Sequence, residues 1–458
     1  MSLEKYFALF RKQVVGRDQT FTSPFGEQKI IYADWTASGR IYKGIEDKLN
    51  QEIFPFVANT HTETSTTGAT MSLAFHEATH IIKNHIGAND DDVLISGGAG
   101  MTMLVCKFQR ILGLKIHEKY IDQVEIKNRP VVFVTHMEHH SNQTSWLETI
   151  AEVALIPHTK DGHIDLVAFQ PLLDKYADRK LKIAAVTSCS NVTGVFTPYY
   201  DIAEIMHDNG GLCFVDFACS APYIDINMHP ENPKQQLDAI YFSPHKFLGG
   251  PGATGILAFK KELYTNKVPD NPGGGTVDWT NPWGEHKYVD DIEAREDGGT
   301  PAFLQTIKTA LCMQLKEKMG VQNILDREHE LHKIVWSKFS ELENVHVLAK
   351  NFPERLGVYS FYIDDLHFYE SPAICSYLDR AHNQSALHPA APEGQARMWQ
   401  WVNVASHYVF PITEERLVMP RVVAPLMGRT PDEKLIADAL PVVRYHLNVV
   451  EARLQEVA

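Results

Sequence analysis

The chain alternates short apolar runs, rich in β-branched residues, with segments whose apolar residues recur at a helical period. The apolar runs include 93–96, 131–135, 183–187 and 211–216, and helical segments such as 101–114 and 202–208 follow them. Such an alternation predicts an α/β fold, in which a mostly parallel sheet carries helices on both faces. Ligands of these sheets bind at the carboxyl ends of the strands. Four polar residues fall at those ends, namely Ser96, Thr135, Thr187 and Asp216.

The pattern changes after the glycine-rich stretch 272–275. A long helical segment, 303–339, is followed by isolated apolar runs and by a last helical segment, 432–457. A chain of 458 residues is long enough for two domains with separate cores. We therefore predict a large domain and a smaller α+β domain, with the boundaries 50–302 for the large domain and 1–49 with 303–458 for the small one.

Composition narrows the classes of partner. The net charge is −14 and lysines and arginines form no long block, so the chain lacks the electrostatic signature of a nucleic-acid or anionic-membrane partner. A small-molecule substrate is favoured. The N-terminus has no apolar core after a basic region, and no uncharged apolar stretch reaches about 18 residues, which predicts a cytoplasmic protein. The six cysteines include no CxxC pair and imply no disulfide framework.

One lysine and one aspartate suggest a cofactor. Lys246 follows the apolar run 237–242 and stands next to His245 and near Ser243, while Asp216 ends an earlier apolar run. A lysine at a strand end can form a Schiff base with pyridoxal phosphate, and a carboxylate from a neighbouring strand can keep the pyridine nitrogen protonated. The sequence therefore predicts chemistry on amino acids with this cofactor.

Three further features fit the same cofactor, and each has an ordinary alternative. The glycine-rich loop 96–102 leads into a predicted helix and suits a phosphate, but it also suits a tight connection alone. His139 follows a strand and could stack on a flat ring, or it could be a surface histidine. Asn191 could bond the phenolic oxygen of the ring, or it could serve only an Asx turn.

In combination, these motifs resemble the aminotransferase class V family, which includes cysteine desulfurases, selenocysteine lyases, kynureninases and isopenicillin N epimerase-like proteins. The resemblance runs from Tyr32 through Thr300 and weakens after about Ser371. Five motifs stand in the family's order, namely Glu-His-His-Ser-Asn (138–142), Ser-Asn-Val-Thr-Gly (190–194), Val-Asp (215–216), Ser-Pro-His-Lys (243–246) and Gly-Gly-Thr-Pro (298–301).

The resemblance implies the type I fold of pyridoxal-phosphate enzymes, with a mostly parallel, seven-stranded-type sheet in the large domain. It also implies Lys246 as the Schiff-base lysine, Asp216 on the pyridine nitrogen and His139 stacked on the ring. Asn191 and Cys219 would lie near the phenolic oxygen. The phosphate would be bound by Ser243, His245, the amides of Gly98 and Ala99, and Thr300 of a neighbouring subunit. The implied assembly is a homodimer with shared active sites.

Cysteine usage departs from the family's desulfurases. These enzymes carry a cysteine on a mobile loop whose thiolate attacks the substrate sulfur. The corresponding segment, 383–389, contains none, and no cysteine follows Cys375. Cys219 itself stands where a glutamine is frequent, and a thiol is a weaker hydrogen-bond partner. We therefore predict a reaction without a persulfide on the protein.

The anchor for the substrate carboxylate also differs. Aligning 401–404 with the late strand that carries the family's arginine places Asn403 at its position, and an amide cannot copy a bidentate guanidinium. Either another cation holds the carboxylate or the substrate lacks one. The substrate-binding candidates are Asn403, His61 and Arg40, with Arg380 and Arg397 as further cations.

Several reactions share a first step in which Lys246 removes the Cα proton of the substrate. We rank first a lyase that cleaves a side-chain bond of a sulfur- or selenium-containing amino acid. Transamination and racemisation or epimerisation, on an amino acid or an amine, come next.

Two other interpretations compete. The segment 76–80 reads His-Glu-Ala-Thr-His and fits the zinc motif H-E-x-x-H. The longer zinc-protease continuation is absent after His80, and we expect 71–85 to be an amphipathic helix before the phosphate loop, so we predict no metal. The other interpretation is a scaffold that keeps the fold without catalysis. Retention of the lysine and its neighbours argues against it.

Overall fold

The structure is a computed structural model that describes residues 2–23, 26–60, 64–352, 354–363, 375–376, 379–380, 388–426 and 428–457. The chain divides into two compact units, Met1–Asp364 and Asp365–Ala458, and we describe each by itself. The domain boundaries predicted from the sequence stay a prediction.

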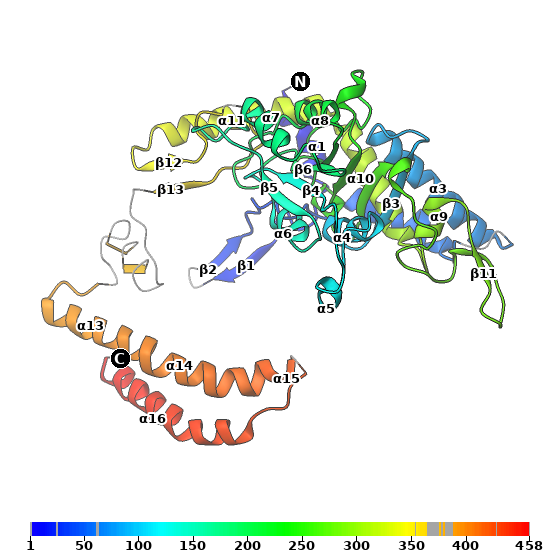
Figure 1. The fold of residues 1–458 in the computed structure, drawn as a ribbon. Coiled ribbons are helices and arrows are strands. Elements are labelled where there is room, and N and C mark those ends of the chain that lie inside the picture. Colours follow the sequence, from blue (N-terminus) through cyan, green and yellow to red (C-terminus); the bar gives the residue numbers. More distant parts are fainter. Residues whose placement is uncertain are drawn as a thin grey trace. The chain divides into compact units, whose positions relative to one another are not determined.

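A seven-stranded sheet is the largest in the described part of the chain and forms the centre of the first unit (Figure 1). Its order is β3-β9-β8-β7-β6-β4-β5, and β9 runs antiparallel to both of its neighbours while the other pairs are parallel. The predicted α/β class with a mostly parallel sheet is therefore confirmed. The strands are β3 (Asp92–Gly97), β4 (Val131–Val134), β5 (Glu152–Leu155), β6 (Lys182–Thr187), β7 (Leu212–Asp216), β8 (Ala239–Phe242) and β9 (Gly255–Lys260).

Side chains of the central strands alternate between two buried cores. On β4, Val131 and Phe133 belong to one core, whereas Val132 and Val134 belong to the other. Helices α3, α7, α8 and α10 cover the first core, and α4 and α6 cover the second. Because both faces are buried, these strands read as continuous apolar runs. The helices are α3 (Thr66–His85), α4 (Met101–Ile111), α6 (His140–Leu147), α7 (Leu166–Lys175), α8 (Tyr199–Asp208) and α10 (Phe303–Met319).

Two helix predictions differ in outcome. The amphipathic helix expected before the phosphate loop is α3, which begins earlier because Ser65 caps it by accepting a hydrogen bond from the amide of Gly68 at 3.1 Å. The single helix expected over 303–339 is wrong. Gly320 has φ of +76° and ends α10, and α11 (Val321–Ser340) follows. A glycine adopts this left-handed conformation without the steric cost of a Cβ.

The N-terminal segment reaches the turn that carries Lys246. The amide of Gly39 donates to the carbonyl of His245 at 2.9 Å, and the amide of Gly249 donates to the carbonyl of Arg40 at 2.7 Å. A Cβ on Gly39 would lie 1.9 Å from the carbonyl oxygen of Phe247. Only glycine permits this close approach, which brings the residues just before Gly39 beside the lysine.

The rest of the first unit consists of short elements around this core. They are α1 (Leu3–Arg11), the pair β1 (Thr20–Ser23) and β2 (Gly26–Lys29), α2 (Lys43–Lys48), α5 (Glu118–Ile121), the pair β10 (Val277–Thr280) and β11 (His286–Tyr288), α9 (Ile292–Glu296), and the pair β12 (Val345–Val347) and β13 (Phe361–Ile363).

The second unit is helical where it is described. The strand to which we aligned 401–404 is wrong, because these residues end helix α13, which begins with Pro392 in its first turn. Proline suits the first turn of a helix, and good helix formers follow it. The short apolar run 401–404 fits a helix as well as a strand, so the helix continues through it. Further α-helices are α14 (Phe410–Thr413), α15 (Ala424–Leu426) and α16 (Glu433–Val457), and the π-helical stretches Ala405–Val409 and Glu414–Val423 lie before and after α14. None of the described helices of either unit is long and apolar enough to cross a membrane.

Candidate active site

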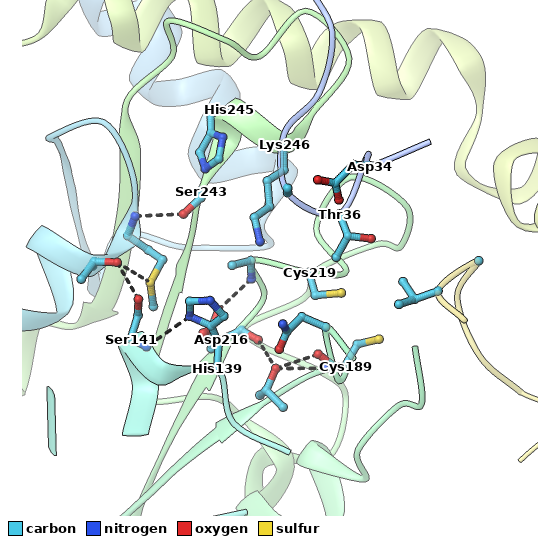
Figure 2. Close-up of a pocket in the computed structure, with 18 of the residues that line it drawn as sticks. Asp34, Thr36, His139, Ser141, Cys189, Asp216, Cys219, Ser243, His245 and Lys246 are labelled. Carbon is cyan, nitrogen blue, oxygen red and sulfur yellow. Dashed lines mark hydrogen bonds between the residues drawn. The ribbon is translucent and has the colours of Figure 1, made fainter. Parts of the chain in front are cut away.

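A cavity of about 590 Å³ lies at the carboxyl ends of the central strands (Figure 2). This volume is within the usual range for small-molecule sites. The cavity brings together seven of the residues predicted from the sequence, namely His139, Asn191, Asp216, Cys219, Ser243, His245 and Lys246. They come from different strand ends, so the parallel topology assembles the site.

Lys246 lies on a tight turn directly after β8. Its side chain extends into the cavity towards Asp216 and His139 (Figure 2). The turn is closely packed, since a Cβ on Gly250 would lie 2.0 Å from the carbonyl oxygen of Pro244. The backbone that carries the lysine is therefore held from both sides, by this turn and by the N-terminal segment.

Asp216 is the last residue of β7 and is 2 % exposed. Its Oδ1 accepts a hydrogen bond from the amide of Ala218 at 2.8 Å. Burial raises the pKa of this carboxyl from 3.8 to about 6, while the hydrogen bond and the charge of Lys246 act in the opposite direction. A buried carboxylate of this kind gains strongly from a cationic partner in the cavity.

Both imidazoles of the cavity are held towards the neutral form. Partial burial lowers the pKa of His139 and of His245, and the positive charge of Lys246 lowers both further. His139 caps α6, and its Nδ1 accepts from the amide of Ser141 at 3.1 Å. In the neutral ring the proton therefore lies on Nε2.

The amino end of α4 lies at another wall of the cavity, where Met101 and Thr102 line it. The amide of Met101 donates to Ser243 Oγ at 3.0 Å, and the hydroxyl of Thr102 donates to Ser141 Oγ at 2.9 Å. Amides and the dipole at a helix N-terminus favour an anion. This wall, with Ser243 and His245, suits a phosphate.

Two residues predicted at the phosphate, Gly98 and Ala99, do not line the cavity. Gly98 has φ of +64°, and its carbonyl accepts from the hydroxyl of Thr254 at 3.0 Å. The loop turns at this glycine, so the residues that reach the cavity are the first two of α4, Met101 and Thr102.

The remaining candidates lie elsewhere. The guanidinium of Arg40 lies 4.9 Å from the centre of the Tyr32 ring and donates to the carbonyl of Val15 at 3.2 Å, outside the cavity lining. Thr300 is exposed and also outside it. His61 lies outside the described residues. Three candidates, Asn403, Arg380 and Arg397, belong to the second unit, so nothing places them relative to the cavity.

Sequence reasoning missed several lining residues. Asp34 and Thr36 reach the cavity from the N-terminal segment, and Tyr359 from a distant loop. Such neighbours are separated by long stretches of sequence, so no local pattern could predict them. Cys189 could have been predicted, because it stands two residues after the end of β6. Residues just past the carboxyl end of a parallel strand lie where such sheets bind ligands.

A buried carboxylate supports the loop that carries His139. Glu138 accepts from Thr135 Oγ1 at 2.6 Å, from the amide of Thr187 at 2.9 Å and from Asn142 Nδ2 at 2.6 Å. Burial raises the pKa of Glu138 from 4.5 to about 7. The side chain thus ties the end of β4, the end of β6 and the start of α6 together.

We expect Glu138→Ala to lower the free energy of unfolding by about 3 kcal/mol, because it leaves buried donors without an acceptor. Urea unfolding followed by circular dichroism measures this loss. The matched control is Glu148→Ala, which removes an exposed glutamate at the other end of α6. Equal unfolding midpoints for the two variants would contradict a supporting role for Glu138.

The zinc motif gains no support. Among the described residues, no group of three or more His, Cys, Asp and Glu is arranged to hold a metal ion. His76 instead lines a second cavity of about 180 Å³ with Phe75 and Thr79.

The cavity residues fit pyridoxal phosphate. Lys246 supplies an amine, Asp216 supplies a buried carboxylate for the pyridine nitrogen, and His139 supplies a neutral ring. The amino end of α4 with Ser243 supplies donors for the phosphate. These residues therefore match the aldehyde, the pyridine nitrogen, the ring face and the phosphate of this cofactor.

Comparison with known proteins gives consistent results. The family model described as aminotransferase class-V matches residues 31–383. A probable cysteine desulfurase of Halalkalibacterium halodurans is 26 % identical over 397 residues, which cover 84 % of this chain and 90 % of that protein. Another, of Staphylococcus epidermidis, is 26 % identical over 356 residues, with 75 % and 80 % covered.

Solved structures show the same fold. The apo structure of a cysteine desulfurase from Thermococcus onnurineus has a TM-score of 0.64 and 24 % identity, covering 82 % of this chain and 86 % of its own. A cysteine desulfurase from Escherichia coli has a TM-score of 0.61 and 18 % identity, with 79 % and 83 % covered.

Proposed function

Since the chain belongs to the aminotransferase class-V family of pyridoxal-phosphate-dependent enzymes, we propose that it is a lyase that cleaves a C–S or C–Se bond in the side chain of an amino acid. The observation that carries this proposal is the convergence of Lys246, Asp216 and His139 on one cavity. The sulfur-containing substrate class is supported by relatives that are probable cysteine desulfurases.

Each residue then has a definite task. When bound, pyridoxal phosphate supplies an electron sink for negative charge at the substrate Cα. Lys246 Nζ would hold the cofactor covalently and would be the base that takes the Cα proton. Asp216 would hold a proton on the pyridine nitrogen. The amino end of α4 and Ser243 would hold the phosphate, and the ring of His139 would stack on the cofactor.

We propose that the sulfur leaves without a persulfide on the C-terminal loop, because no cysteine follows Cys375 in the sequence.

We also propose a cytoplasmic homodimer in which Thr300, exposed in the single chain, contacts the phosphate in the partner's site. The two domains would be those predicted from the sequence, 50–302 and 1–49 with 303–458.

The substrate carboxylate needs a separate test, because none of the described residues that line the cavity is an arginine. An amine that lacks the carboxylate could therefore be the better substrate. L-cysteine and cysteamine differ only in this group, and L-selenocysteine tests the other element.

The experiment supplies the purified protein and pyridoxal phosphate with each of these compounds and measures sulfide or selenide together with the carbon product. With a small-molecule thiol present as reductant, we expect release of sulfide or selenide with formation of alanine from the amino acids. Two molecules of the thiol are then oxidised to a disulfide for each C–S or C–Se bond cleaved. Faster turnover of cysteamine would instead show that the carboxylate anchor is lost. Amino-group transfer to an oxo acid, or racemisation, without sulfide or selenide release would overturn the lyase assignment.

A further inference from the structure

Two thiols lie side by side in the wall of the cavity. Cys189 follows the end of β6 and Cys219 follows the end of β7, and both line the cavity (Figure 2). Both are buried and belong to one small apolar cluster with Leu356. The mechanism proposed above gives neither thiol a task.

The backbone brings the two cysteines together. β6 and β7 are neighbouring parallel strands, and Thr187 pairs with Asp216 at their ends. Cys189 Sγ lies 3.7 Å and Cys219 Sγ 3.8 Å from the same acceptor, the carbonyl oxygen of Ser190. Both residues lie just beyond the strand ends, and their side chains are also within hydrogen-bond reach of each other. A disulfide requires this kind of close approach of two sulfurs, and the shared acceptor and the side-chain contact together provide it.

The two thiols differ in reactivity. A hydrogen bond from Cys189 and the positive charge of Lys246 lower the pKa of Cys219 against the effect of burial. Burial raises the pKa of Cys189 well above its ordinary value. Since the thiolate is the nucleophile and Cys219 is also the more exposed of the two residues, at 5 % against 0 %, we expect Cys219 to react first.

We propose that Cys189 and Cys219 form a site of reversible oxidation, at which a hydroperoxide links them as a disulfide when the cavity holds no cofactor. The cavity admits molecules of water size, and hydrogen peroxide is little larger. Because Cys219 lines the same cavity as Lys246 and Asp216, a cofactor bound there would occupy the space through which a peroxide reaches this sulfur.

The chemistry balances in two steps. The thiolate of Cys219 attacks one oxygen of the peroxide, the O–O bond breaks, and the leaving hydroxide takes a proton to become water. The sulfur of Cys189 then attacks the sulfur of the resulting sulfenic acid, the S–O bond breaks, and the hydroxide leaves as water with the Cys189 proton. Two thiols are oxidised to a disulfide, and one peroxide is reduced to two waters.

The test treats the full-length protein, freed of cofactor, with hydrogen peroxide and maps peptides by mass spectrometry. We expect a linked pair of peptides carrying Cys189 and Cys219, a mass lower by about 2 Da, and recovery of both thiols with a reductant. With pyridoxal phosphate bound, the rate at which the link forms should fall by about tenfold or more. The readout is the bond itself, so it succeeds or fails independently of turnover with L-cysteine.

Variants separate the two sulfurs. In Cys189→Ser, dimedone should trap a sulfenic acid at Cys219, whereas Cys219→Ser should give no link and no such adduct at Cys189. The control Cys375→Ser removes an exposed cysteine and should leave the link unchanged. Oxidation of Cys375 in the cofactor-free wild type without a link between Cys189 and Cys219 would overturn the proposal, as would equal rates with and without cofactor.

Discussion

Lys246→Ala is expected to abolish turnover and the absorption band at about 410–430 nm that a lysine-bound pyridoxal phosphate gives. Among the described residues no other lysine lines the cavity, so none of those lysines is placed to replace its amine. Absorption spectra and activity with saturating pyridoxal phosphate measure both effects. A variant that kept the band and the activity would refute the assignment of this lysine.

The fold should survive the substitution, because the side chain extends into the cavity and the turn is held by backbone contacts. Lys261→Ala is the matched control, since it removes an exposed lysine at the end of β9. We expect both variants to unfold at the same urea concentration as the wild type. Loss of the band in Lys261→Ala as well would mean that spectra report folding and not the covalent bond.

The regular part of the fold could be predicted because its signals are local. The runs at β4 and β6 are apolar without interruption, as strands buried on both faces must be. Their ends place Thr187 and Asp216 together once the strands are parallel. The predicted strand at 401–404 was wrong, because a short apolar run fits the end of a helix equally well.

Site residues that directly follow a strand could be predicted from the sequence. Site residues that distant loops bring to the cavity could not. Lys246 and Asp216 each follow a strand directly. Asp34 and Thr36 arrive only because Gly39 allows its backbone to approach Phe247, and nothing near either residue in the sequence signals that contact. Tertiary packing between distant segments decides such positions, and local pattern cannot.

Asp216→Asn is expected to stabilise the cofactor-free protein at neutral pH while it impairs the enzyme. Burial raises the pKa of Asp216 from 3.8 to about 6, so the folded state binds this proton more tightly than the unfolded state. Stability from this group is complete below pH 3.8 and is lost as the pH rises through about 6. A difference of about two pH units corresponds to about 3 kcal/mol.

Asparagine does not titrate, so the variant should be more stable than the wild type by up to about 3 kcal/mol above pH 6 and nearly equal to it below pH 4. Urea unfolding of both cofactor-free proteins across this range measures the difference. Glu138 also titrates in the folded state, and the charge of Asp216 raises its pKa further, so removal of that charge stabilises the variant in the same direction. Asp178→Asn, which changes a carboxylate whose side chain is 81 % exposed, should show no such dependence.

With pyridoxal phosphate present, we expect the wild type to be the more stable of the two proteins. A neutral amide cannot hold a proton on the pyridine nitrogen, so turnover should fall by about 100-fold or more, and the cofactor should stabilise the variant less than the wild type. Equal stabilisation of both proteins by the cofactor would mean that the carboxylate does not face its ring nitrogen. If Asp216→Asn is more stable than the wild type without cofactor and less stable with it, the buried charge of Asp216 destabilises the protein without cofactor. The protonated pyridine nitrogen of the bound cofactor then offsets this destabilisation.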